Sequence, residues 1–135
     1  MAEGAPLRVV AAILRRDDRV LLCHRHPNRE WYPNVWDLPG GHIEPSEEAV
    51  DALVRELREE LGIEVARGLA LPFQQVTDAA VGVELMIWLL DWEGAVVNDA
   101  PEEHDELRWM TSDELRDVPL AHPSYVQLLS DALIA

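Results

Sequence analysis

The sequence predicts a mixed α/β sandwich, from the order of its hydrophobic patterns and from its length. Apolar runs of strand length come first, an amphipathic helix pattern follows at residues 46–61, and further strand patterns lead to a helix pattern near the C-terminus. The chain has 135 residues, of which 48% are hydrophobic, so it can bury a core of its own. Because no internal repeat or linker divides the sequence, we expect one domain over residues 1–135.

The N-terminal part is predicted to form two strands joined by a polar turn. Residues 9–14 and 20–23 are apolar runs, and only arginine and aspartate separate the last hydrophobic residue of the first run from the second. Residues 25–37 contain two prolines and two asparagines and are predicted to form a loop, with Trp31 and Tyr32 at its middle.

The most regular helix pattern covers residues 46–61, after a predicted sharp turn at Pro39-Gly40-Gly41. Ser46 is a suitable N-cap, and Gly62 favours the left-handed conformation that ends a helix. At about 100° per residue, the apolar side chains of this helix form one stripe toward the core. Three glutamates, at positions 56, 59 and 60, lie on a face about 120° from that stripe, at the edge of the buried side.

The second half of the chain is predicted to contain three further strands, at residues 65–75, 83–92 and 107–110. A short helix then begins after Thr111, and residues 123–133 read as a final helix. The alternation of strands and helices is what defines the fold class.

Charge and composition restrict the partners and the compartment. The formal net charge of −15 argues against nucleic acid and against an anionic membrane. A single cysteine, Cys23, and an N-terminus without a basic and apolar leader predict a cytoplasmic protein. A phosphorylated small molecule would be repelled by this charge unless a bound divalent cation inverted the local field.

Residues 41–63 carry the most specific motif. They match G-x5-E-x7-R-E-U-x-E-E-x-G-U, where U is an aliphatic residue, at every specified position. Carboxylates at positions i, i+3 and i+4 of one helix converge, and their mutual repulsion favours a bound cation. Taken alone, the three glutamates would more often be a solvated helix face. The joint pattern of glycines, arginine and glutamates at fixed offsets favours a divalent metal site.

This motif resembles the signature of the Nudix hydrolases, and the whole chain resembles the short MutT-like members of that family. The resemblance implies an α/β/α sandwich with a central mixed sheet and a loop–helix–loop Nudix box. It implies Mg2+ as cofactor, which Mn2+ can replace. The implied metal ligands are the glutamates at three box positions and one backbone carbonyl, namely Glu56, Glu59, Glu60 and Gly40. Residues implied to hold the box together are Gly41, Glu47 and Gly62.

The resemblance also implies roles for Arg55 and for an acidic residue outside the box. Arg55 would orient the neighbouring glutamate. The general base varies in this family, so that Glu56 and Glu103 are both candidates. Glu103 lies in the acidic segment 101–106, where relatives carry a glutamate used as ligand or base, and we favour it over Glu102 and Glu106.

The expected substrate contacts lie outside the box. Arg25 follows a strand similar to one after which relatives carry an arginine on substrate phosphate. Trp31 and Trp36 are candidates for stacking on a base, and packing of the loop onto the core is the equal alternative. His122 stands where the relative that removes 8-oxo-dGTP has an asparagine, so this segment looks closer to relatives acting on cytidine-type triphosphates.

We therefore expect a pyrophosphohydrolase that cleaves a nucleoside triphosphate to the monophosphate and pyrophosphate by attack of water on phosphorus. ADP-ribose or a sugar nucleotide is the alternative substrate, although residues 77–82 lack the proline and the tyrosine typical of other subgroups. A nucleotide sensor without catalysis is the alternative of another class, and the complete box argues against it. The expected partner is a small-molecule nucleotide, and both monomer and homodimer remain open.

Overall fold

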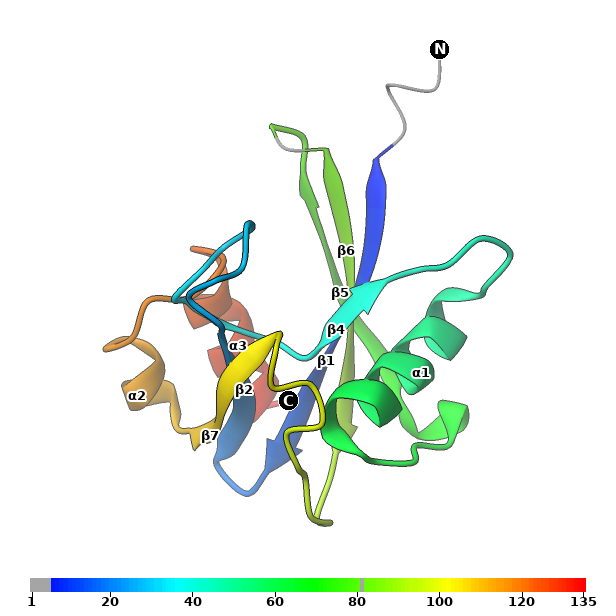
Figure 1. The fold of residues 1–135 in the computed structure, drawn as a ribbon. Coiled ribbons are helices and arrows are strands. Elements are labelled where there is room, and N and C mark those ends of the chain that lie inside the picture. Colours follow the sequence, from blue (N-terminus) through cyan, green and yellow to red (C-terminus); the bar gives the residue numbers. More distant parts are fainter. Residues whose placement is uncertain (1–5, 81) are drawn as a thin grey trace.

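A computed structural model describes residues 6–80 and 82–135 and contains a mixed sheet with helices on both faces (Figure 1). The predicted α/β sandwich is confirmed, whereas the N-terminal residues 1–5 lie outside the described part of the chain. The strands are β1 (Leu7–Arg16), β2 (Arg19–Arg25), β3 (Trp36–Asp37), β4 (Gly40–His42), β5 (Leu71–Asp78), β6 (Val83–Asp91) and β7 (His104–Met110). The helices are α1 (Ala49–Leu61), the 3-10 helix η2 (Arg67–Leu69), α2 (Ser112–Leu115) and α3 (Tyr125–Leu133).

The central strands β1 and β2 separate soon after the turn that joins them. They pair only at Arg15↔Val20 and Arg16↔Arg19. Beyond these pairs β1 continues between the parallel strand β6 and the short strand β4, while β2 pairs with β3 and β7. The sheet therefore divides into two halves, and the functional site described below lies between them.

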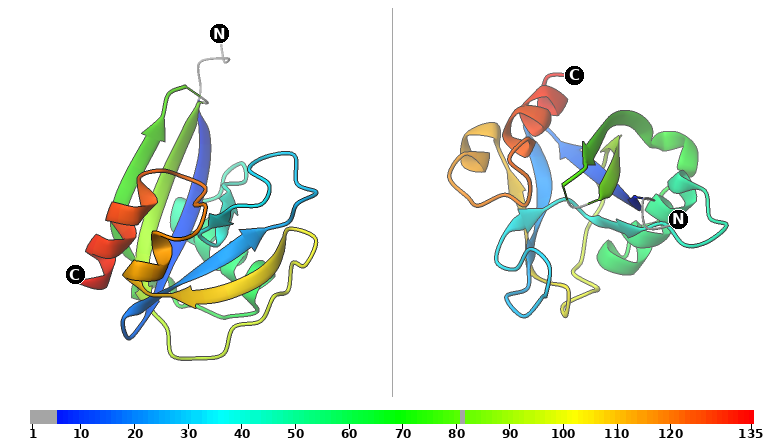
Figure 2. Two further views of the ribbon diagram at one scale, coloured as in Figure 1. Left: turned by 90° about the vertical axis from the view of Figure 1, so that its left-hand side faces the viewer. Right: turned by 90° about the horizontal axis from the view of Figure 1, so that it is seen from above.

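Each face of the sheet carries its own hydrophobic core. Helix α1 covers one face and α3 the other, as the two views in Figure 2 show. The stripe of Leu53, Leu57 and Leu61 on α1 is fully buried, as predicted from its spacing. Burial of each such leucine stabilises the fold by roughly 2 kcal/mol, so α1 is anchored firmly.

The predicted N-terminus of α1 is wrong, and its predicted C-terminus is confirmed. Ser46 has a φ of 68°, and the helix begins at Ala49 with Glu48 at the N-cap position, where no side chain caps it. The backbone N–H of Glu47 instead donates to the carbonyl of Glu44, which closes a separate turn before the helix. Gly62 adopts a φ of 66° and donates its N–H to the carbonyl of Arg58.

The segment between α1 and β5 also differs from the prediction. Residues 67–69 form η2 instead of the first part of a strand, and β5 runs from residue 71 to residue 78. Strand β7 begins at His104, three positions before the predicted start at residue 107, because its first residues pair with the end of β2. The final helix begins at Tyr125, two residues later than predicted.

The predicted turn at Gly40-Gly41 is strand β4, which lies across β1. Gly40 stands opposite Ala11, and Gly41 opposite Val10. A Cβ atom on Gly40 would meet the Val10 carbonyl oxygen at 1.9 Å, so only glycine allows this close approach. Among residues 6–80 and 82–135, no helix is both long and apolar enough to cross a membrane.

Candidate functional site

A cleft of about 430 Å3 opens where β1 and β2 separate. Its volume lies in the range of small-molecule sites. We call one set of its lining residues the acidic side, and these are Gly40, Gly41, Glu56, Glu60, Glu103 and His104. We call another set the aromatic side, and these are Arg25, Trp31, Tyr32, Asp37, His122 and Tyr125.

Arg55 of α1 does not line the cleft, but it contacts the acidic side through Glu56. Its Nε and Nη2 atoms donate to the two carboxylate oxygens of Glu47, at 2.9 and 3.0 Å. Its Nη1 donates to Glu56 Oε1 at 2.9 Å, and its Nη2 also donates to the His42 carbonyl at 3.0 Å. The hydrogen bond from Arg55 lowers the pKa of Glu47 below its ordinary value. One planar guanidinium thus ties the loop before α1 to the helix and fixes a carboxylate of the cleft.

The absence of a side chain at Gly41 leaves space for the Glu56 carboxylate. A Cβ atom at Gly41 would meet the carboxylate atoms of Glu56 at 2.5–2.7 Å. The Glu56 side chain therefore packs directly against the backbone of β4. Any larger residue at this position would push that carboxylate off the cleft wall.

Glu60 is a buried carboxylate with an incomplete set of partners. It is only 4% exposed, and its Oε1 lies 3.5 Å from the backbone nitrogen of Gly40. Its Oε2 has no hydrogen-bond partner among the residues that the structure describes. Burial first, and then the neighbouring Glu56, raise the pKa of Glu60 well above its ordinary value. A bound cation would relieve both effects, because it supplies the missing partner and offsets the repulsion.

The third glutamate of the helix, Glu59, points away from the cleft. Its side chain is 56% exposed, and it lies 3.4 Å from Arg55 Nη1. No three acidic, histidine or cysteine side chains gather at metal-ligating spacing within residues 6–80 and 82–135. Mg2+ is commonly held by one or two carboxylates, with waters and substrate phosphates completing its shell. The unpartnered Glu60 oxygen beside Glu56 fits that mode of binding, and a closed protein cage is not required.

Glu103 enters the cleft from the segment just before β7. Its Oε1 lies 3.3 Å from Arg29 Nη1, and its backbone carbonyl accepts from the His26 N–H at 2.9 Å. The loop at residues 26–35 is thereby tied to the residue that we favoured as general base. The sequence did not single out Arg29, since one arginine in a predicted loop carries no local signal of such a contact.

A half-buried carboxylate lies on the aromatic side. Asp37 Oδ1 accepts from the Leu38 N–H at 2.8 Å and from the Tyr125 hydroxyl at 3.2 Å. Arg25 Nη1 lies 3.7 Å from Asp37 Oδ2. Burial raises the pKa of Asp37, and the positive charge of Arg25 opposes that rise.

The predicted substrate contacts have different positions. Arg25 lines the cleft, but its Nε and Nη2 donate to the carbonyls of Trp31 and Tyr32, so it also holds the loop. Trp31 lines the cleft and is 71% exposed. His122 lines the cleft as well, with Nδ1 2.7 Å from Ser124 Oγ. The prediction of Trp36 as a substrate contact needs correction: it is 6% exposed, packs in the core under α3, and does not line the cleft.

Sequence reasoning missed three polar lining residues: Asp37, which is half-buried, and His104 and Tyr125, which are buried. For Tyr125 a signal existed, because Tyr125, Leu128 and Leu129 fall at helical spacing and a buried tyrosine hydroxyl requires a partner. His104 stands among acidic residues, a pattern that normally indicates exposure, and only the pairing of β7 with β2 buries it. No local signal distinguishes it.

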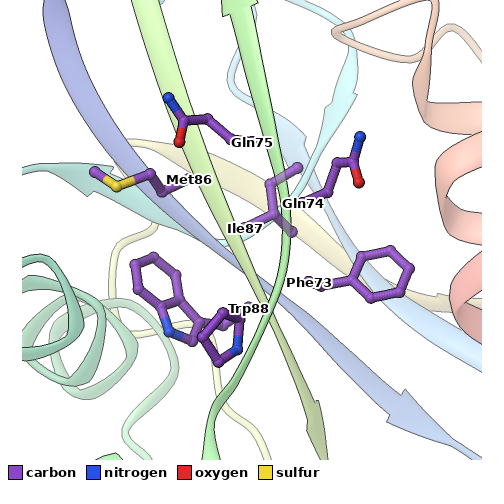
Figure 3. Close-up of a pocket in the computed structure, with 7 residues that line it drawn as sticks. Phe73, Gln74, Gln75, Met86, Ile87 and Trp88 are labelled. Atoms are coloured by element: carbon purple, nitrogen blue, oxygen red, sulfur yellow. The ribbon is translucent and has the colours of Figure 1, made fainter.

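A second hollow, of about 330 Å3, lies along the edge pair β5 and β6 (Figure 3). Phe73 and Ile87 point to the α3 face of this pair, whereas Met86 and Trp88 point to the α1 face. The hollow follows the register shift of β5 near Phe73. No titratable side chain lines it, so it offers nothing for phosphate or metal chemistry.

Comparisons with known proteins agree with this fold. A family profile described as the NUDIX domain matches residues 5–131. The CTP pyrophosphohydrolase of Escherichia coli (strain K12) is 38% identical over 124 residues, covering 91% of this chain and 88% of that protein. The nucleoside triphosphatase NudI of Klebsiella pneumoniae (strain 342) is 28% identical over 136 residues, covering 93% and 96%. The crystal structure of a MutT NUDIX hydrolase from Burkholderia pseudomallei has a TM-score of 0.78 at 32% identity, covering 93% and 97%.

Proposed function

This chain belongs to the Nudix family, and we propose that it hydrolyses nucleoside triphosphates to monophosphate and pyrophosphate with the help of Mg2+. The observation that carries the proposal is the composition of one cleft. It combines the carboxylates of Glu56, Glu60 and Glu103 with a separate side lined by exposed aromatic rings. The first set suits phosphates held through a divalent cation, and the second suits a base.

Different residues would bind the cation and orient its ligands. Glu56 and Glu60 would hold the cation, which when bound would neutralise negative charge on the phosphates. Arg55 keeps Glu56 oriented through the hydrogen bond from its Nη1. Glu59, which lies outside the lining of the cleft, is the least supported of the ligands that the family resemblance implies.

We assign the general base to Glu103. Its side chain is 42% exposed, so a water molecule can reach it, whereas the Glu56 side chain is only 14% exposed. In the reaction, the water oxygen forms a bond to one phosphorus and its proton passes to Glu103. The phosphoanhydride bond on the opposite side of that phosphorus breaks, and the nucleoside monophosphate separates from pyrophosphate.

A nucleoside triphosphate is favoured over ADP-ribose or a sugar nucleotide as substrate. Two relatives matched over most of their length bear the names CTP pyrophosphohydrolase and nucleoside triphosphatase. We propose a cytidine-type triphosphate as the first candidate, because His122 lies in the cleft where the relative that reads 8-oxo-guanine carries asparagine. We further infer a cytoplasmic enzyme whose single, buried Cys23 stays reduced.

The test is hydrolysis of canonical and oxidised triphosphates, ADP-ribose and sugar nucleotides, with Mg2+ or Mn2+ and with identification of the products. Release of pyrophosphate from a triphosphate, abolished by EDTA, is the expected result. Preference for ADP-ribose or a sugar nucleotide would replace the substrate and keep the chemistry. Binding of nucleotide without turnover of any of them would replace the enzyme by a sensor.

A further inference from the structure

We propose that His104 is a positioning residue, whose ring N–H orients the Glu60 carboxylate toward the cation on the acidic side. The inference rests on the proposed function, because it concerns the same cation. It assigns a role to a buried side chain that the reaction as described above does not use. Three observations carry it: the orphaned oxygen of Glu60, the burial of His104 beside it, and the way the chain holds His104.

Glu60 has one oxygen directed at polar neighbours and one without any. Oε1 lies 3.5 Å from both His104 Nε2 and the Gly40 backbone nitrogen. Oε2 is buried and has no partner among the described residues. The Gly40 N–H donates to Oε1, and a second hydrogen bond from His104 would restrict rotation of the carboxylate and leave Oε2 for a ligand. Ligating carboxylates in proteins are commonly fixed in this way by hydrogen bonds from residues behind them.

His104 is as buried as Glu60, and its ring nitrogens also lack hydrogen-bond partners. Both side chains belong to residues that are 4% exposed. Within the described chain, neither Nδ1 nor Nε2 of His104 has a hydrogen-bond partner. A separation of 3.5 Å is at the outer limit for a hydrogen bond, and closing it by about 0.5 Å would give the usual N–H···O length. Catalytic hydrogen bonds are often this long before ligands bind and tighten in the complex.

The chain holds the backbone of His104 against the C-terminal end of α1, which carries Glu60. The Asp99 N–H donates to the Glu60 carbonyl at 2.9 Å, so this segment also satisfies an end carbonyl of the helix. Asn98 Nδ2 then donates to the His104 carbonyl at 2.7 Å, and the His104 N–H donates to Ala100 at 3.1 Å. A turn of five residues therefore fixes the imidazole beneath the carboxylate that it is proposed to orient.

Replacing His104 by three different residues tests the proposal. His104→Gln keeps an amide N–H near the position of Nε2, whereas His104→Asn keeps a shorter amide that does not reach Glu60. His104→Leu removes the donor at similar volume. Each protein is titrated with Mn2+ in the absence of nucleotide, with the dissociation constant read from the signal of free Mn2+. Melting temperatures in EDTA report folding independently of the metal, and kcat and KM are measured at saturating Mn2+.

We expect the Mn2+ dissociation constant to rise by about 10-fold in His104→Leu and His104→Asn, and to stay within about threefold in His104→Gln. Activity at saturating Mn2+ should recover in all three, with the KM for nucleotide unchanged. Equal Mn2+ affinity in the Gln and Asn variants would overturn the role of His104, and this comparison holds even if the Leu variant fails to fold. Absence of Mn2+ binding by the unmodified protein would instead overturn the proposed function.

Discussion

The two sides of the cleft are built in different ways from the same chain. The acidic side comes mainly from one continuous stretch, residues 40–60, to which are added Glu103, just before β7, and His104, the first residue of β7. The aromatic side draws on β2, the loop after it, β3, and the region at the start of α3. Its residues are thus separated by as many as 100 positions, from Arg25 to Tyr125.

The two sides also differ in how firmly their side chains are held in place. On the acidic side a single arginine, Arg55, holds two glutamates, so the positions of the charges are fixed by local contacts. On the aromatic side Trp31 is largely exposed, and Asp37 is a half-buried carboxylate. We therefore expect changes on the acidic side to act on kcat and metal binding, and changes on the aromatic side to act on KM and base preference.

Glu60→Gln should give the largest effect, because it removes a buried ligand charge at nearly constant shape. We expect kcat to fall by at least about 100-fold and Mn2+ binding to weaken. Without metal, the melting temperature should stay equal or rise, because the amide replaces a carboxyl group whose charged form is disfavoured by burial and by Glu56. Glu64→Gln, at an exposed position close to the end of the same helix, is the control. Near-native turnover of Glu60→Gln would contradict the assigned role.

Arg55→Lys should come next. A lysine ammonium cannot bridge Glu47 and Glu56 with the planar donors of a guanidinium. We expect kcat to fall by about 30-fold, in the range typical when a supporting partner of a metal site is lost. Arg58→Lys on the same helix replaces a single exposed contact with Glu64 and should retain wild-type kcat. Equal kinetics of the two variants would remove Arg55 from the catalytic arrangement.

Asp37→Asn examines the aromatic side. The half-buried carboxylate of Asp37 accepts hydrogen bonds only, whereas an amide both donates and accepts. We expect the ratio of kcat/KM between CTP and the other triphosphates to change by about 10-fold, with Mn2+ affinity unchanged. Asp131→Asn on the outer part of α3 is the matched control. A uniform loss for all bases would show that Asp37 supports the fold and does not read the base.

Trp31→Ala should have a smaller effect confined to KM. The ring is 71% exposed, so its loss costs little stability. If it stacks on the base, KM should rise by about fivefold, since such contacts contribute about 1 kcal/mol. The measurement is KM with the preferred triphosphate, and unchanged KM would leave Trp31 as a loop residue without contact to substrate.

The pH dependence of stability gives the smallest expected signal and involves both sides. Burial raises the pKa of Glu60 and of Asp37, so the folded chain holds protons that the unfolded chain has already released. The contribution of these two carboxyl groups to stability then falls as pH rises from the ordinary carboxyl range through the raised values, whereas His104, whose pKa is lowered by burial, contributes in the opposite direction. Without metal, we expect the melting temperature to be higher at about pH 5.5 than at about pH 7.5, by about 3 °C.

Glu60→Gln and Asp37→Asn should each make the melting temperature less dependent on pH, by the contribution of the carboxyl group that is removed. Saturating Mg2+ should reduce or reverse the slope, because cation binding competes with the proton on Glu60. A pH profile that is unchanged in both Glu60→Gln and Asp37→Asn would show that neither carboxyl group is held in its protonated form.

The positions of the box residues on α1 could be predicted from spacing alone. A helix turns by about 100° per residue, so the leucine stripe and the glutamate face follow from their numbers. Gly62 predicts the end of the helix for a similarly local reason, because its φ of 66° favours glycine. In the tertiary structure, a Cβ atom there would also meet Asp99 and Val97. The predicted start of the helix was wrong because the Glu47 carboxylate accepts hydrogen bonds from the Glu44 N–H and from Arg55. These contacts hold the residues before Ala49 in a separate turn.

What the sequence determined by itself is the family, the fold class and the helix that carries the box. Tertiary structure decided which carboxylates enter the cleft, since Glu59 and Glu60 are adjacent in sequence yet one is exposed and the other buried. It also buried Trp36 in the core and brought His104 beneath Glu60. Helical periodicity is a local property of the backbone, whereas burial depends on which distant strand or helix packs against each side chain.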